Sequence, residues 1–182
     1  MKHILMAVSG PAGVGKGTIV KTLIARRDDV VESVSCTTRA PREGEVDGKH
    51  YFFLSKEEFL RRIDEKDFLE YDEHFGNYYG TPRSFVEETL KTKSVILEID
   101  VVGALNVKEK FPELVLVMIA PPSVEELKRR LIGRGSENEE SLKIRLARLE
   151  YELAQRDKYD HYIVNDDLET AIAEVEKILD GE

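Results

Sequence analysis

Cysteine is almost absent from this chain of 182 residues, in which Cys36 is the single example. One thiol cannot form a disulfide within the chain, and it cannot build a metal site that rests on several cysteines. Long apolar runs are also missing, because the longest ones, Ile4–Val8 and Leu114–Ala120, are far too short to cross a bilayer. The apolar run near the N-terminus leads straight into a glycine-rich segment, which is not the layout of a signal peptide. We therefore expect a cytoplasmic protein without a membrane partner.

A broad excess of positive charge is missing as well, since 27 basic residues face 36 acidic ones and the net charge is −9. Proteins that bind nucleic acids usually carry a broad basic face, so we expect no nucleic-acid partner. The charge is unevenly spread, however: residues 1–42 have a balance of +4, residues 126–156 of +2, and residues 157–182 of −7. The two basic segments are where a small phosphorylated ligand is expected to bind.

The length fits one domain, and a content of 41% hydrophobic and 35% charged residues is typical of a globular chain. Apolar, β-rich stretches alternate with helical ones, which predicts an α/β fold with a mainly parallel sheet flanked by helices. The predicted strands are His3–Val8, Val34–Cys36, Val95–Ile99, Leu114–Ile119 and Tyr162–Val164. Capping patterns predict helix starts at Ser55, Ser123, Ser136, Thr81-Pro82 and Asp166–Glu169, and Gly181 is predicted to end the last helix.

Two segments interrupt the alternation. Short β-like pieces and four glycines in residues 37–80 predict an inserted, mostly antiparallel subdomain with one short helix. Residues 124–156 predict two helices, the second with a leucine stripe on one face. The predicted division of the single domain is a core of residues 1–36, 81–123 and 157–182, an inserted subdomain of residues 37–80, and a helical lid of residues 124–156.

A glycine-rich segment with one lysine follows the first predicted strand and precedes a predicted helix, as a P-loop requires. Glycines let backbone N–H groups converge on an anion, the helix directs its positive end at it, and the lysine adds a mobile charge. The residues expected to bind ATP here are Gly10, Pro11, Ala12, Gly13, Val14, Gly15, Lys16, Gly17 and Thr18. Gly17 stands where the strict motif has Ser or Thr, which would offer Mg²⁺ a hydroxyl group.

A second anion site is predicted around Arg39 and Arg42, which are separated by the rigid Pro41. Two guanidinium groups held on a turn suit a phosphate monoester, because each can bind it with two hydrogen bonds. Tyr51 and Tyr79 offer hydroxyl donors to the same anion. Each of these residues taken alone fits ordinary packing or a solvated surface, so the hypothesis rests on the combination.

The chain resembles guanylate kinase, a P-loop nucleoside monophosphate kinase family, from the P-loop to about residue 166. The matching segments are residues 33–42 (SVSCTTRAPR), 47–52 (DGKHYF), 68–70 (FLE), 76–81 (GNYYGT), 96–100 (ILEID) and 134–137 (RGSE). This resemblance implies a P-loop NTPase-type fold with an inserted GMP-binding subdomain and a lid. It also implies ATP-dependent phosphorylation of GMP, and of dGMP, to the diphosphate.

The resemblance assigns a role to individual residues of this chain. Arg39, Arg42, Tyr51 and Tyr79 are expected to bind the GMP phosphate. The residues expected at the guanine base are Ser35, Glu70, Thr81 and Asp100, with Glu70 accepting from N1–H and the exocyclic amine. A carboxylate attracts that donor edge and is repelled by the acceptor N1 of adenine.

Such kinases bring arginines of the lid over the ATP phosphates, and the matching residues here are Arg130, Arg134 and Arg145. Arg148 is a weaker candidate for the same role. Asn165 is expected near adenine. Lys16, Arg39, Arg134 and Arg145 are the expected catalytic residues, because phosphoryl transfer needs positioning and positive charge around the transition state. The GMP phosphate has a second pKa near 6, so no general base is required. We expect Mg²⁺ to be held mainly by phosphates and water.

Two alternatives remain open at this point. A related kinase of another phosphorylated acceptor, such as a ribose bisphosphate, is disfavoured by the guanine-facing set. A binding module that no longer catalyses is expected to have a damaged P-loop, whereas Lys16 and the lid arginines are present here. The chain is expected to act as a monomer or a homodimer.

Overall fold

The computed structural model describes residues 3–133 and 139–181, and its centre is a five-stranded sheet in which every neighbouring pair of strands is parallel. The strand order is β2-β7-β1-β8-β9. These strands are β1 (Leu5–Ser9), β2 (Val30–Glu32), β7 (Ser94–Glu98), β8 (Val115–Ala120) and β9 (His161–Val164). The helices packed against them are α1 (Lys16–Arg26), α3 (Arg83–Thr89), α4 (Val101–Lys110) and α7 (Leu168–Asp180). The predicted parallel sheet flanked by helices is therefore confirmed.

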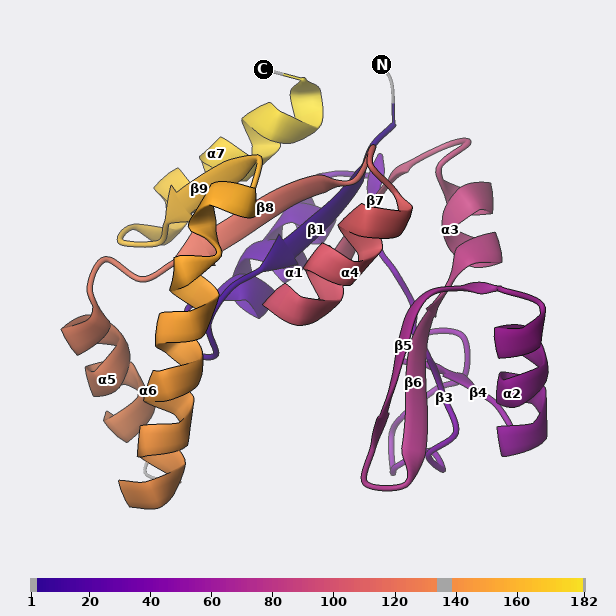
Figure 1. Ribbon diagram of the computed structural model, residues 1–182. Helices are drawn as coiled ribbons and strands as arrows, with labels where there is room; N and C mark the ends of the chain where they lie inside the picture. Colours follow the sequence, from indigo (N-terminus) through magenta and orange to yellow (C-terminus); the bar gives the residue numbers. More distant parts are fainter. Residues whose placement is uncertain (1–2, 134–138, 182) are drawn as a thin grey trace.

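Both faces of this sheet are buried, which explains why its strands are nearly continuous apolar runs. Along β1, Met6 and Val8 point to the face covered by α1 and α7. Leu5 and Ala7 point to the opposite face, where buried side chains of α3 and α4 cover them. The sheet consequently holds the carboxyl ends of its strands, and the loops that follow them, on a rigid frame (Figure 1).

A second sheet of four short strands lies apart from the first one (Figure 1). Its order is β4-β3-β6-β5, with β3 (Cys36–Thr37), β4 (Phe52–Phe53), β5 (Phe68–His74) and β6 (Asn77–Pro82). Two of its three pairings are antiparallel, as predicted for this part of the chain. The short helix α2 (Lys56–Asp64) covers one face, and its Phe59 ring stacks on Phe68 at a centroid distance of 4.3 Å.

Two helices project from the large sheet on the side away from α2 and α3 (Figure 1). They are α5 (Val124–Gly133) and α6 (Glu139–Ala154), and the short 3-10 helix Arg156–Lys158 follows. The leucine stripe of α6 packs against Leu127 of α5, which confirms the helix pair predicted for residues 124–156. Ser123 caps α5 by accepting a hydrogen bond from the amide of Glu126, whereas the predicted cap at Ser136 lies outside the described residues.

Two sequence-based boundaries are wrong. The strand expected at Val34–Cys36 does not form: β2 ends at Glu32, Val34 and Ser35 belong to no strand, and β3 begins at Cys36, where the chain enters the small sheet. The helix expected to be capped by Thr81 begins at Arg83 with Pro82 as its N-cap, because Thr81 is still paired in β6. The other caps hold: Ser55 and Asp167 accept amide hydrogen bonds, and Gly181 ends α7 in the left-handed conformation.

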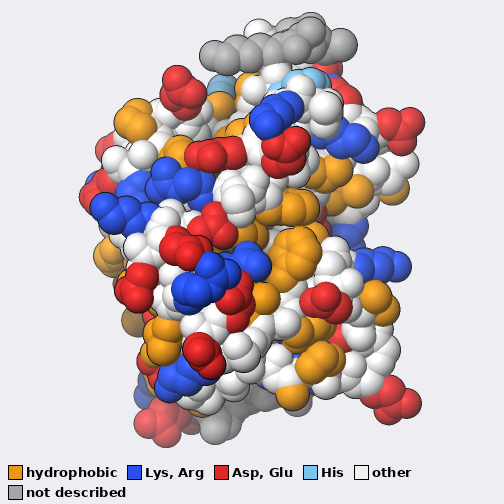
Figure 2. Space-filling view, turned by 90° about the vertical axis from the view of Figure 1, so that its right-hand side faces the viewer, with side chains coloured by type: hydrophobic (Ala, Val, Ile, Leu, Met, Phe, Trp, Pro, Cys, Tyr) orange, Lys and Arg blue, Asp and Glu red, His pale blue; other side chains and the backbone are white. Residues whose placement is uncertain are grey.

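The face that carries α2 and α3 shows basic and acidic side chains interleaved around an apolar strip (Figure 2). On α2, Glu58 pairs with both Arg61 and Arg62, and Arg61 also pairs with Glu65. Such exposed pairs contribute little to stability, about 0–1 kcal/mol each. Their relevance is that they occupy most of the cations on this helix.

Candidate active site

The phosphate-binding loop joins β1 to α1 with a backbone that only glycine adopts easily. Gly10, Gly13 and Gly15 have φ angles of 144°, 82° and 101°. A Cβ atom at Gly10 would lie 2.1 Å from the carbonyl oxygen of Ile119 on β8, so no larger residue fits there. The local sequence thus produces the strand, loop and helix that the P-loop pattern predicts.

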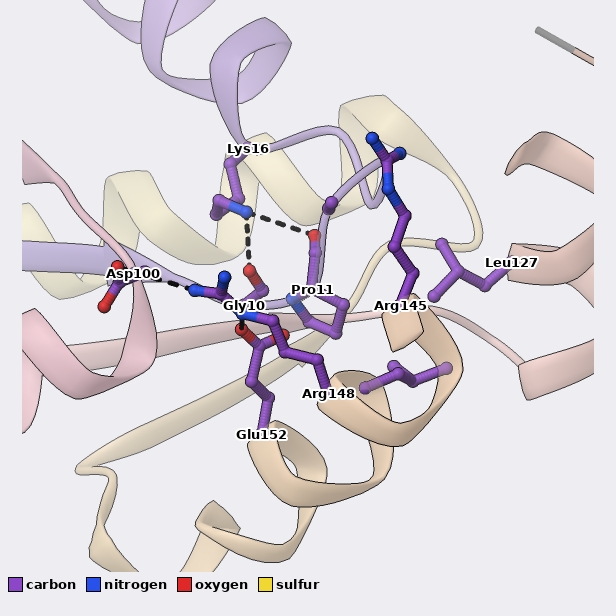
Figure 3. Close-up of a pocket in the computed structure, with 10 residues that line it drawn as sticks. Gly10, Pro11, Lys16, Asp100, Leu127, Arg145, Arg148 and Glu152 are labelled. Atoms are coloured by element: carbon purple, nitrogen blue, oxygen red, sulfur yellow. Dashed lines mark hydrogen bonds and ion pairs between the residues drawn. The ribbon is translucent and has the colours of Figure 1, made fainter. Parts of the chain in front are cut away.

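Lys16 is the first residue of α1, and its side chain folds back over the loop. Its Nζ donates to the carbonyl oxygens of Gly10 at 2.6 Å and Pro11 at 3.1 Å (Figure 3). Burial lowers the pKa of Lys16, while the carboxylates of Glu152 and Glu98 act in the opposite direction. The charge is therefore held at the loop on neutral carbonyl groups, from which it can move to a phosphate.

Asn165 follows β9 and reaches the underside of the loop. Its Nδ2 donates to the carbonyl oxygen of Val14 at 2.9 Å, and a Cβ atom at Gly15 would lie 2.6 Å from the same nitrogen. The side chain is buried, so it supports the loop from below. Its expected contact with adenine stays a prediction.

A cavity of about 290 Å³ lies between this loop and α6 (Figure 3). Its cations come from α1 and α6, and its two carboxylates come from α6 and from the N-cap of α4. Its lining consists of Gly10, Pro11, Ala12, Lys16, Asp100, Leu127, Arg145, Arg148, Leu149 and Glu152. The mixture of positive groups and a glycine-rich loop suits a polyphosphate.

Arg148 connects α6 to the end of β7. Its guanidinium lies 3.5 Å from Asp100 Oδ2, and its Nε donates to Glu152 at 3.0 Å (Figure 3). Sequence reasoning ranked Arg148 below the other lid arginines, but it lines the cavity. Glu152 is buried and was not predicted as a site residue; its spacing of four residues from Arg148 on one helix face is the signal that was available.

The other lid arginines are placed differently. Arg145 also lines the cavity and extends past Pro11 on the side away from Asp100 (Figure 3). Arg130 belongs to α5, but its side chain is not part of what the structure describes. Arg134 lies outside the described residues. The roles expected for Arg130 and Arg134 remain predictions.

Arg39 follows β3 and is held by a carboxylate that sequence reasoning missed. Its NH1 and NH2 groups donate to the two oxygens of Glu45 at 3.0 and 2.8 Å. Glu45 also accepts the amide of Arg42 at 2.7 Å, and these contacts, first of all that with Arg39, lower the pKa of Glu45 to about 2. The signal was the short spacing in RAPREGE, where a carboxylate follows each arginine closely.

The aromatic residues predicted for the same anion surround Arg39. Its Cζ lies 5.5 Å from the centre of the Tyr51 ring, and the Tyr51 and Tyr79 rings lie 6.1 Å apart. A hydrogen bond that Arg39 donates to the hydroxyl oxygen of Tyr79 helps to raise the pKa of Arg39, after the larger effect of Glu45. Arg42 is close enough for its charge to lower the pKa of Glu45. The structure thus brings the four predicted phosphate-binding residues together.

Glu70 and Thr81 face each other across β5 and β6. The hydroxyl of Thr81 donates to Glu70 Oε1 at 2.8 Å. Burial raises the pKa of Glu70; the hydrogen bond from Thr81 lowers it, and the charge of Asp100 raises it further. A carboxylate with one oxygen bound by a hydroxyl and the other available is suited to a pair of N–H donors.

A second cavity of about 160 Å³ lies between the two sheets, and its lining includes Ser35, Tyr51, Thr81 and Glu98. Asp100, two residues beyond Glu98, lines the first cavity. Asp100 caps α4 by accepting the amide of Gly103 and lies beside Arg148, so its expected contact with guanine stays a prediction. Both cavities therefore have a carboxylate at the carboxyl end of β7 in their lining, and ligands gather at such strand ends in open α/β sheets.

Gly17 leaves a space next to a carboxylate. A Cβ atom at Gly17 would lie 3.4 Å from Glu98 Oε1 and 3.7 Å from Oε2, and the position has no positive φ. The region normally filled by a hydroxyl ligand of Mg²⁺ thus borders a carboxylate oxygen, which is a ligand that Mg²⁺ prefers. Within residues 3–133 and 139–181, no three His, Cys, Asp or Glu side chains gather as a metal site. A magnesium ion fits here only with further oxygens from phosphate and water.

Two other features bear on the class of protein. In the described part of the chain, no helix combines the length and the apolar character needed to span a membrane. Cys36 is buried, and burial raises the pKa of its thiol to about 11, which makes it a poor nucleophile.

Comparison with known proteins agrees with this geometry. The family model for guanylate kinase matches residues 2–182. A guanylate kinase of Clostridium perfringens strain SM101 is 54% identical, and the match covers 98% of this chain and 83% of that protein. A guanylate kinase of Clostridium tetani strain Massachusetts is 51% identical, and the match covers 100% of this chain and 87% of that protein. A crystal structure of guanylate kinase from Anaplasma phagocytophilum is 35% identical, with a TM-score of 0.72, and the match covers 98% of this chain and 85% of that one. On this evidence, the chain belongs to the guanylate kinase family.

Proposed function

We propose that the two cavities bind ATP and GMP and that phosphoryl transfer occurs between them, at the carboxyl end of β7. As a member of its family, the chain phosphorylates GMP to GDP with ATP, releasing ADP. The observation that supports this division of the site is the position of Glu98 and Asp100, two residues apart on one strand end but in different cavities. One substrate would approach from α6 and the other from the small sheet.

On the ATP side, the amides of residues 10–18 would bind the phosphates, and Lys16 would exchange its carbonyl partners for phosphate oxygens. Arg145 and Arg148 line the same cavity from α6 and would add positive charge near the transferring group. Charge placed in advance around the transition state is the main contribution that a protein makes to phosphoryl transfer. The equivalent roles of Arg130 and Arg134 are part of the same proposal.

On the GMP side, Arg39 and Arg42 would grip the phosphate with the hydroxyls of Tyr51 and Tyr79. Glu45 holds the fork of Arg39 in place before the substrate arrives, because the pair is already bidentate. Ser35, Glu70 and Thr81 would bind the guanine edge, with Asp100 predicted close to its amine. Glu70 is half-buried, and a carboxylate there that loses its N–H partners is left partly unsatisfied, which costs about 1–3 kcal/mol and disfavours adenine.

The transfer itself needs little from the protein beyond this geometry. An oxygen of the GMP phosphate attacks the terminal phosphorus of ATP, and the bond from that phosphorus to the oxygen of ADP breaks. The attacking group is largely ionised at neutral pH, so no side chain has to remove a proton. Mg²⁺, with Glu98 and phosphate oxygens around it, would supply positive charge to the phosphates.

The division of the chain into a core, a GMP-binding segment of residues 37–80 and a lid of residues 124–156 is part of the proposal. Movement of the two segments over the substrates would exclude water from the activated phosphate. We also propose that dGMP is accepted, that the protein acts in the cytoplasm, and that it works as a monomer or homodimer.

A coupled assay of ADP formation tests the proposal. The protein with ATP and Mg²⁺ is expected to release ADP when GMP or dGMP is added and not when AMP is added. Thermal denaturation is the matching binding test, since a ligand at 100 times its Kd stabilises by about 2.7 kcal/mol. GMP should raise the midpoint and AMP should not. A protein that turns over AMP as well as GMP would contradict the role given to Glu70.

A further inference from the structure

A third cavity, of about 270 Å³, lies beside β5, where the end of α2, the start of α3 and the end of α4 come together. It is lined by Ile63, Lys66, Phe68, Tyr71, Arg83 and Lys110. Three of these six residues are cations and none is a carboxylate, in a chain whose net charge is −9. Lys66 comes from the end of α2, Arg83 from the start of α3 and Lys110 from the end of α4. We refer to these three residues as the hinge cations.

The hinge cations differ from most other basic residues of the molecule. In the part of the chain that the structure describes, none of the three lies within ion-pair distance of a carboxylate. Asp67, which follows Lys66 directly, instead accepts the amide and hydroxyl of Ser84 and lies 3.6 Å from Arg62. The cavity therefore gathers three cations that form no ion pair with a described carboxylate, although the charge of Lys110 acts on Glu70.

A second observation, independent of the charge, is that Arg83 has a hydrogen-bond donor without an acceptor. Its Nε is buried and has no hydrogen-bond acceptor, a condition that few buried polar groups of native proteins show. The guanidinium is fixed in position, because its Cζ lies 4.7 Å from the centre of the Phe111 ring. A fixed fork with an unsatisfied donor, at the wall of a basic cavity, is suited to an oxyanion.

Lys66 enters the cavity from a backbone conformation that favours glycine. It has a φ of 58° at the end of α2, where its amide donates to the carbonyl oxygen of Ile63. Glycine would adopt this conformation at lower cost. The lysine side chain is thus held at the cavity in spite of its backbone conformation, and replacing it with glycine removes the charge without straining the fold.

From these observations we infer that the hinge cations form a binding site for a phosphate dianion, free or as the terminal group of a small phosphomonoester. Three cations on three elements suit the several oxygens of a phosphate better than a single carboxylate. This site is separate from the two substrate cavities.

Occupation of the hinge site has a direct route to the GMP side. Tyr71 lines the hinge cavity and is adjacent to Glu70 on β5. The charge of Lys110 lowers the pKa of Glu70, and Lys110 makes a long 3.5 Å contact with the carbonyl oxygen of Leu69. An anion that draws Lys110 toward itself would weaken its influence on Glu70. This consequence rests on the proposed role of Glu70, whereas binding at the hinge does not.

Calorimetric titration of inorganic phosphate tests the site, using the protein saturated with GMP, ADP and Mg²⁺ at constant ionic strength. GMP and ADP occupy the two substrate cavities without transferring a phosphate. The position of the third ATP phosphate stays open, so only phosphate binding that is lost in the hinge variants is assigned to the hinge site. The wild-type protein should bind one further phosphate. Arg83→Gln and Lys66→Gly should each weaken it at least about tenfold, since each removes a charged donor. Lys91→Gln, which removes the same charge from the Glu88-paired lysine just beyond α3, should leave it unchanged.

Absence of a further site in the saturated wild-type protein would overturn the inference, as would equal affinity in the wild type and both hinge variants. Thermal denaturation separates these outcomes from misfolding, because Lys66→Gly relieves a strained backbone and should melt no lower than the wild type. Parallel titrations with inorganic phosphate and phenyl phosphate distinguish the two sources. If the wild type binds inorganic phosphate or phenyl phosphate and the hinge variants lose that binding, the site is supported. If the wild type binds neither compound, the inference is overturned.

The route to Glu70 has its own test. The KM for GMP is measured at saturating ATP with and without inorganic phosphate. The rise in KM should be larger in the wild type than in Arg83→Gln, where only competition at the substrate phosphates remains. An equal rise in the two proteins would overturn the coupling, whatever the calorimetry shows.

Discussion

The phosphate-binding loop and the GMP side of the site are built in opposite ways. The loop is continuous in sequence, and its geometry depends on backbone conformation: Gly10 meets the carbonyl of Ile119, and Lys16 lies on the loop's own carbonyl groups. The GMP side is assembled from side chains of several elements, such as Arg39 on Glu45 and Thr81 on Glu70. A change in the loop should therefore affect transfer, and a change on the GMP side should affect one substrate.

The difference also concerns what each region does before substrates bind. Lys16 is held by neutral carbonyl groups that a phosphate can displace, so its charge is available. Arg39 is held by a carboxylate, so its orientation is fixed in advance although part of its charge is compensated. Substitutions that separate charge from orientation can test this contrast.

The largest effect is expected for Lys16→Met. The variant keeps the length of the side chain and removes the charge, so kcat should fall by about 10²–10³-fold, the usual effect of losing one group that stabilises the transition state. The Kd of Lys16→Met for GMP, measured by calorimetry, should stay within twofold of the wild type. The control is Lys21→Met, on the exposed part of α1, whose kcat and Kd should also stay within twofold. An equal loss in both variants would show that overall charge, and not the position of Lys16, is responsible.

A smaller effect is expected for Arg39→Lys, which keeps the charge and removes the bidentate fork. Because one charge-assisted hydrogen bond contributes about 1.5–3 kcal/mol, kcat/KM for GMP should fall at least about tenfold. The KM for ATP should change less than twofold. Steady-state kinetics with each substrate varied would decide this, and turnover equal to that of the wild type would place Arg39 on the surface rather than in the site.

Stability should respond to Glu70→Gln in a pH-dependent way. Burial raises the pKa of Glu70, so ionisation of this carboxyl destabilises the folded state. The stabilising contribution of the protonated form is complete below the unfolded pKa of about 4.3 and is lost as pH rises through the folded pKa. Gln still accepts from Thr81 and carries no charge, so its melting temperature should exceed that of the wild type at pH 7.

The difference in melting temperature between Glu70→Gln and the wild type should shrink as the pH approaches 4. At neutral pH, each kcal/mol would correspond to about 2–4 °C in a domain of this size. Calorimetric scans of both proteins between pH 4 and pH 8 would measure it. A variant that melts below the wild type at pH 7 would mean that Glu70 is stabilising as a carboxylate.

The smallest effect is expected for Gly17→Ser. The position already belongs to α1, and a Cβ atom there meets nothing closer than the Glu98 carboxylate at 3.4 Å. Activity should change less than about threefold, the range of substitutions that disturb no packing, with any gain appearing as a lower Mg²⁺ requirement. Mg²⁺ titrations of ADP formation on both proteins would show this. If the natural protein were inert at every Mg²⁺ concentration and Gly17→Ser restored turnover, Glu98 could not replace the missing hydroxyl.

The sequence predicted what depends on neighbouring residues. The P-loop, the caps at Ser55 and Asp167 and the two helices of residues 124–156 are local patterns, and the structure has all of them within its described part. The strand expected at Val34–Cys36 was wrong because both sheets use the same β-rich composition, and nothing local marks the point where the chain changes sheets. Composition alone does not encode strand partners.

Contacts between distant elements were the other limit. Arg148 meets Asp100 and lies next to Lys16 only because α6 folds across the loop. Glu98 reaches Gly17 from a different strand. The hinge cations come from three elements, so their shared cavity could not be read from the sequence. The anion site of Arg39, Arg42, Tyr51 and Tyr79 was predicted from the residues themselves, whereas Ser35, Glu70, Thr81 and Asp100 were assigned through family resemblance.

Kinetics of Glu70→Gln with both substrates varied test the central claim, that GMP and ATP are read by separate surfaces. Glu73→Gln is the control, since it removes the same charge from an exposed position of β5. The account predicts that kcat/KM for GMP falls about tenfold to a hundredfold in Glu70→Gln, in line with one unsatisfied half-buried group, while the KM for ATP stays within twofold. Unchanged use of GMP, or an equal loss for ATP, would contradict it.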